Sequence, residues 1–112
     1  MAADVKLAPG QYWSTSGGLL AYIIDRLAVV VGDPDVASSL RLIDEANLGV
    51  VDLGEFGEPV RRRLLSYLAD GLVRDAEAAP LPGAPDWDAT VRALSELADR
   101  AQAELDADAQ RI

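Results

Sequence analysis

The feature that most restricts the fold of this chain is a regular apolar stripe near its C-terminal end. Its members recur at alternating steps of four and three residues: Trp87, Val91, Leu94, Ala98, Ala101 and Leu105. This spacing is typical of a heptad seam, which runs along one side of a helix. Asp86 is suited to cap the start of this helix, and we expect the helix to run to about Ala107. Such a helix has to pack along its length against another helix.

A second long amphipathic pattern precedes this stripe. Apolar residues at helical spacing predict a helix from Glu58 to about Ala79, in which Gly71 indicates a close crossing with another element. Residues 80–85 contain three prolines and form a linker that cannot continue a helix. So short a linker favours antiparallel packing of the two helices. Because the seam is shorter than three heptads, we prefer packing within the chain, and a homodimer through the seam is the alternative.

Two further helices are expected in the first half of the chain. Apolar residues at helical spacing predict one from about Gly18 to Val31. The next helix has Asp33 as its N-cap and Pro34 at its first position, and Asn47-Leu48-Gly49 offers a stop. Val50-Val51 then reads as an extended connector. It leads into a short helical turn over residues 52–57, which begins with capping-box spacing.

The N-terminal segment over residues 1–17 has a different pattern. Pro9-Gly10 is a turn signal between two short, partly apolar pieces. The segment is therefore either a small hairpin or an extended lead-in. Together, these patterns predict a single all-α domain over residues 1–112, with about four helices in a small bundle behind this short N-terminal segment.

The side-chain inventory argues against catalysis. The chain contains no His and no Cys, and Lys6 is its single lysine. These absences remove the usual nucleophiles, bases and soft metal ligands. Asp33-Pro34-Asp35 lacks the further oxygen donors of a calcium loop, so we expect neither a metal nor a cofactor. We therefore predict a protein that is not an enzyme, and an enzyme built on two carboxylates in a cleft is the remaining catalytic alternative.

The charge balance restricts the partners of the chain. It carries 19 acidic and 10 basic residues, a net charge of -9, and no segment is basic overall. This predicts no direct binding of nucleic acid and favours a basic protein partner, with solubility as the alternative explanation of the acidic surface. The longest apolar run, residues 17–31, is interrupted by Asp25-Arg26 and is too short to span a membrane. The N-terminus lacks the pattern of a secretory signal, so a cytoplasmic protein is expected.

Aromatic and acidic residues in the first half are the candidates for partner binding. Tyr and Trp are the residue types most enriched as interface anchors, and packing in the core is the equal alternative for Tyr12 and Trp13. Several acids also bracket the helix that begins at Pro34. The predicted partner-binding residues are Tyr12, Trp13, Asp33, Asp35, Asp44, Glu45, Asp52 and Glu55.

Residues 40–77 carry a resemblance to a known class of proteins. They combine a helix, the turn Val-Val-Asp-Leu-Gly-Glu-Phe and a long Arg-rich amphipathic helix in a small acidic chain. In this respect the chain resembles the immunity proteins of bacterial polymorphic-toxin systems. The resemblance implies a protein that binds a cognate toxin domain and blocks its active site or substrate groove. A homo-oligomeric structural or regulatory helical module is the alternative function.

Overall fold

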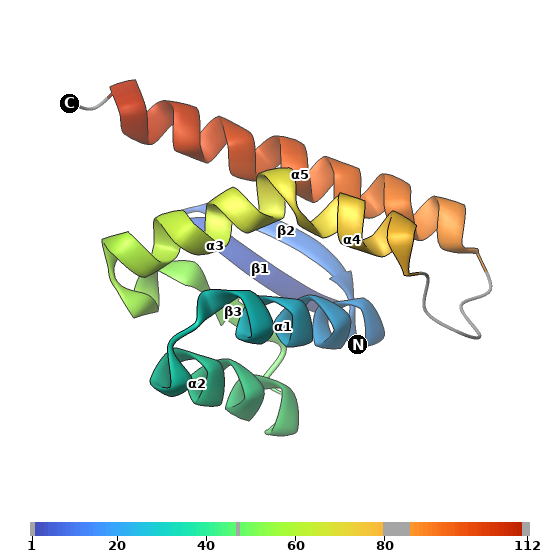
Figure 1. Cartoon of the computed structure of the whole chain (residues 1–112), viewed down its shortest axis with the longest axis horizontal. Coiled ribbons are helices and arrows are strands. Elements are labelled where there is room, and N and C mark those ends of the chain that lie inside the picture. The colour runs from blue at the N-terminus through green and yellow to red at the C-terminus, as the bar shows by residue number, and fades with distance from the viewer. Residues whose placement is uncertain (1, 47, 80–85, 111–112) are drawn as a thin grey trace. The chain divides into compact units, whose positions relative to one another are not determined.

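The computed structural model describes residues 2–46, 48–79 and 86–110. These residues form two compact units, residues 1–64 and residues 65–112. Figure 1 shows the elements of both. The predicted linker at residues 80–85 and the stop residue Asn47 lie outside the described residues. The single domain over residues 1–112 stays a prediction.

The first unit contains a sheet that the sequence analysis did not predict. Strands β1 (Ala2–Ala8) and β2 (Gln11–Ser16) form an antiparallel hairpin around the Pro9-Gly10 turn. Strand β3 (Val50–Asp52) lies parallel to β1 on its other side, so the strand order is β2-β1-β3. The predicted all-α class is therefore wrong, and the fold is α+β. The hairpin alternative for the N-terminal segment is confirmed.

Alternation along the strands explains why these residues pair. Successive side chains of a strand point to opposite faces, and Ala3, Val5 and Leu7 are all buried. In the register of the sheet, Val5 lies opposite Trp13 on one side and Val51 on the other. All three side chains are buried, so this row forms the centre of the sheet's apolar face. The predicted extended connector is thus a central contributor to the core of the unit.

Two helices follow the hairpin and lie antiparallel to each other (Figure 1). Helix α1 (Gly17–Val31) begins with Ser16 as its N-cap and buries Ile23, Ile24 and Leu27, among others. Gly32, in the left-handed conformation with φ of 71°, ends it. Helix α2 (Pro34–Glu45) buries Leu40 and Ile43. The predicted helix starting at Pro34 is confirmed.

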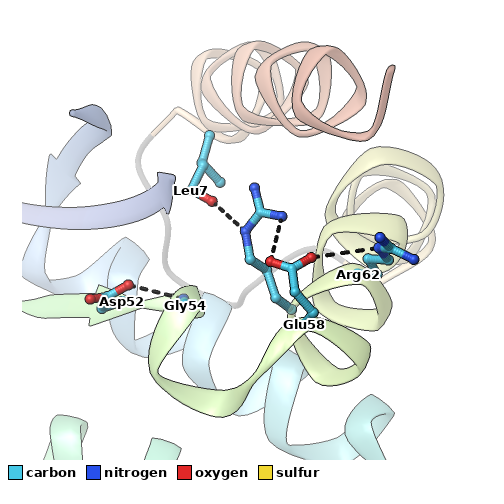
Figure 2. Close-up of polar contacts among 6 residues, drawn as sticks. Leu7, Asp52, Gly54, Glu58 and Arg62 are labelled. Carbon is cyan, nitrogen blue, oxygen red and sulfur yellow. Dashed lines mark hydrogen bonds and ion pairs between the residues drawn. The ribbon is translucent and has the colours of Figure 1, made fainter. Parts of the chain in front are cut away.

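The remaining elements of the first unit are a short 3₁₀-helix, η1 (Leu53–Phe56), and the start of helix α3 (Glu58–Asp70). The arginines at the start of α3 reach in different directions. The Arg61 Nε–H donates to the Leu7 carbonyl at 3.0 Å (Figure 2). The Arg63 Nη1–H donates to the Val31 carbonyl at 2.7 Å. A guanidinium here satisfies a free carbonyl at the negative end of α1.

The second unit contains the end of α3, helix α4 (Leu72–Ala78) and helix α5 (Trp87–Gln110). The single helix predicted over residues 58–79 is therefore wrong, because α3 and α4 are separated at Gly71. Helix α5 packs against α4, with the Trp87 Nε1–H donating to the Ala76 carbonyl at 3.0 Å. No helix among the described residues is long and apolar enough to cross a membrane.

Candidate protein-binding surface

One face of the sheet in the first unit stays open to solvent, and we call it the open face. It carries the side chains that alternate with the buried row: Asp4, Lys6, Tyr12, Ser14, Val50 and Asp52. The strand register arranges them in two rows across three strands. Two predicted partner-binding residues, Tyr12 and Asp52, therefore lie on one surface.

The first row contains Tyr12, Lys6 and Asp52, with Lys6 in the middle. Its Nζ lies 5.9 Å from the centroid of the Tyr12 ring and 3.7 Å from Oδ2 of Asp52. The Asp52 Oδ1 accepts a hydrogen bond from the Gly54 N–H at 2.9 Å, which caps η1 (Figure 2). Asp52 is thus held by a turn and by an ion pair, while the Tyr12 side chain is 47% exposed. This row presents an exposed aromatic ring beside an ion pair.

The second row contains Asp4 between Ser14 and Val50. The Ser14 hydroxyl donates to the Asp4 carboxylate. Val50 is exposed at the outer edge of the sheet. Sequence analysis missed Asp4, Lys6 and Val50, although the alternation of polar and apolar residues over Asp4 to Leu7 could have revealed the strand.

Trp13 does not belong to this surface. It follows Tyr12 directly, and neighbours on a strand point to opposite faces. The Trp13 side chain is 3% exposed, opposite Val5 on the buried face. The burial of Trp13 agrees with the core-packing alternative and leaves almost none of its side chain for a partner. Its indole fills the core of the unit instead.

The acids at the start of α2 have a structural role. The Asp33 Oδ1 accepts hydrogen bonds from the Asp35 N–H at 2.9 Å and from the Val36 N–H at 3.3 Å. Asp33 is therefore the N-cap, as predicted. Asp35 lies in the first turn, where the positive end of the helix dipole favours a carboxylate. Helix capping and the dipole account for both acids.

The acids at the other end of α2 have no such explanation. Asp44 and Glu45 are exposed in the last turn, which contains no basic residue. Neither forms an ion pair within the described part of the chain. The negative end of the dipole disfavours a carboxylate by about 0.3–1 kcal/mol. We therefore expect these two acids to lower the free energy of unfolding of the free protein.

Exposed apolar side chains accompany these two acids. Leu42 on α2 is 58% exposed, and Leu48, just beyond the helix, is 62% exposed. The Leu48 N–H donates to the Ile43 carbonyl at 3.1 Å, so the chain turns back against the end of α2. We call Leu42, Asp44, Glu45 and Leu48 the α2 end. It combines exposed leucines with unpaired carboxylates.

Other predicted residues lie elsewhere. Glu55 is exposed on η1. In the predicted seam of α5, Leu94, Ala98 and Ala101 are buried, while Trp87, Val91 and Leu105 are half-buried. Among the described residues, no group of three or more acids could hold a metal ion.

Comparisons with known proteins add no family to this geometry. No protein family, no curated protein sequence and no solved structure matches the chain. The functional argument therefore rests on the surfaces described above.

Proposed function

We propose that this protein is a non-enzymatic inhibitor of the immunity-protein type, which binds a basic enzyme such as a toxin domain and covers its substrate groove. The observation that carries the proposal is the α2 end. Asp44 and Glu45 occupy the end of a helix where negative charge is unfavourable, and Leu42 and Leu48 are exposed beside them. The local structure of the free chain gives no reason for this combination.

A basic partner would reverse this unfavourable balance. Lys or Arg side chains placed against Asp44 and Glu45 would neutralise the negative end of α2 and pair with both carboxylates. Burial of Leu42 and Leu48 at the same time would remove apolar surface from water, at about 25 cal/mol for each Å². The acidic surface would also speed the encounter with a basic partner.

Tyr12 and Asp52 on the open face form the second part of the proposed contact. Exposed tyrosines are frequent anchors at protein interfaces because the ring is large and has few rotamers. Lys6 and the cap of η1 hold this row before any partner arrives. Inhibition would follow from steric occlusion, which requires no catalytic group in this chain.

The first test concerns the free protein. Replacement of Asp44→Asn together with Glu45→Gln should raise the free energy of unfolding by about 0.5–2 kcal/mol, because it removes two charges from the negative end of α2. The matched control, Asp35→Asn, should lower it by about 0.3–1 kcal/mol, because Asp35 lies at the positive end. Urea unfolding followed by circular dichroism measures both. If the double variant is no more stable than the parent, the two acids are not unfavourable at the end of α2, and the proposal loses this support.

The second test concerns the partner. The tagged protein should capture from its native host a basic enzyme that it inhibits when both are purified. Asp44→Asn with Glu45→Gln should weaken this binding by about tenfold, which corresponds to about 1.4 kcal/mol. Ser38→Ala, an exposed change on the same helix, should leave it unaltered. The proposal would be contradicted if the inhibited partner is acidic, or if its affinity is the same for the parent and for the variant without both acids.

A further inference from the structure

The two edges of the sheet differ in how they are protected against another strand. Edge strands offer free backbone groups, and proteins protect them with short length, charged side chains or proline. Strand β3 has three residues, one of which is Asp52. Strand β2 has six residues, and none is charged or proline. No described strand pairs with its outer edge.

The uncharged stretch extends well beyond β2. Residues 7–24 contain no Asp, Glu, Lys or Arg, in a chain of net charge -9. Gln11, Tyr12, Ser14 and Ser16 are all exposed. The neutral edge of β2 therefore lies on a protein whose acids are spread along the rest of the sequence.

We propose that β2 pairs antiparallel with β2 of a second copy of this chain, which joins two three-stranded sheets into one of six strands. Two copies with the same net charge repel each other where their acids meet. At the edge of β2, no like charges lie directly opposite each other. A two-fold axis there makes the contact self-complementary. A basic partner would instead bind at acidic positions such as the α2 end. The proposed pairing of β2 therefore does not rest on the proposed function.

Pairing over the full length of β2, Gln11–Ser16, places the two-fold axis near the middle of the strand, at Trp13 or Ser14. Directly opposite residues point to the same face, so a register that keeps the buried faces continuous pairs odd positions with odd. With the axis at Trp13 or at Ser14, the two Ser14 residues are opposite or diagonal neighbours. Their Cβ atoms are then about 5–8 Å apart. The two Tyr12 side chains lie on one continuous open face.

Sedimentation equilibrium of the full chain tests the proposal. We expect the mass to rise with concentration from 11.9 kDa towards twice that value. Ser14→Lys places two like charges near the axis and should abolish this rise, whereas its cross-strand neighbour Asp4 still supports the hairpin. The control Ser38→Lys adds the same charge to the exposed surface of α2 and should leave the dimer intact. A mass of 11.9 kDa at the highest soluble concentration would overturn the proposal.

The absence of Cys allows a second, independent readout. A single Cys at Ser14→Cys should be joined to its copy by a short bis-maleimide cross-linker, which also spans diagonal positions too far apart for a disulfide, much faster than the control Ser38→Cys. Equal rates for the two variants would contradict pairing at β2. A dimer that survives Ser14→Lys would also contradict it, and would point to another surface, such as the α5 seam.

Discussion

Gly71→Ala is the substitution for which the structure makes the sharpest prediction. In an ordinary helix the change would stabilise the protein by about 1 kcal/mol, because Ala has the higher helix propensity. At Gly71, an added Cβ would lie 2.7 Å from Cδ1 and 2.8 Å from Cε1 of Tyr67. Carbon atoms do not approach so closely, so the ring or the backbone has to move.

The Tyr67 ring has little freedom to move. Its side chain is 8% exposed, and its hydroxyl donates to Oδ2 of Asp75 at 2.7 Å. Overpacking of a core costs about 1–3 kcal/mol, and a weakened hydrogen bond to a carboxylate adds to this cost. After subtraction of the gain in propensity, we expect Gly71→Ala to destabilise the protein by roughly 1–3 kcal/mol.

A double-mutant cycle separates the two effects. In a Tyr67→Leu background the ring is absent, so Gly71→Ala should become neutral or stabilising by up to about 1 kcal/mol. Urea unfolding followed by circular dichroism gives all four free energies. If Gly71→Ala stabilises the parent protein, or if its effect is the same in both backgrounds, the steric argument is refuted.

Three further predictions concern the first unit, and urea unfolding measures each. Trp13→Ala should cost about 3–5 kcal/mol, but Tyr12→Ala on the opposite face only about 0.5 kcal/mol; similar losses would show that the two faces are misassigned. Asp33→Ala should cost about 1 kcal/mol through loss of the N-cap of α2, and an unchanged midpoint would contradict this role. Arg63→Met should cost about 1–2 kcal/mol, because the Val31 carbonyl loses its charged donor, whereas Arg62→Met on the exposed surface should cost less.

Local signals predicted the helices well where a cap and an apolar period coincide. Asp33 with Pro34 located the start of α2, and Asp86 located the start of α5, where its Oδ1 accepts from the Ala89 N–H. Capping is a contact between residues two or three positions apart, so it can be read from neighbouring residues. The separation of α3 and α4 at Gly71 cannot be predicted from the sequence, because a glycine within a helical pattern also occurs in unbroken helices.

The full sheet could not be predicted from the sequence, because two of its strands pair across a long distance along the chain. Strands β1 and β3 are separated by more than forty residues, and β3 has only three residues. Parallel pairing needs a long crossover, here through α1 and α2, and no local pattern specifies which segment returns to β1. This has a consequence for the site: without the strand alternation, the sequence predicts Tyr12 and Trp13 as one aromatic pair, whereas they point to opposite faces of the sheet.

Some properties of the candidate surfaces can be predicted from the sequence, and others require the tertiary structure. Net acidity, the absence of His and Cys, and the uncharged stretch over residues 7–24 are properties of composition and order, and they follow from the sequence alone. Only the tertiary structure shows that Tyr12 and Asp52 lie on the same face, on either side of Lys6. It also shows that Leu42 is exposed beside the acids at the end of α2. Caps and periods arise from contacts between near neighbours along the chain. Faces and edges arise from pairings between distant segments, which exist only once the tertiary structure has formed.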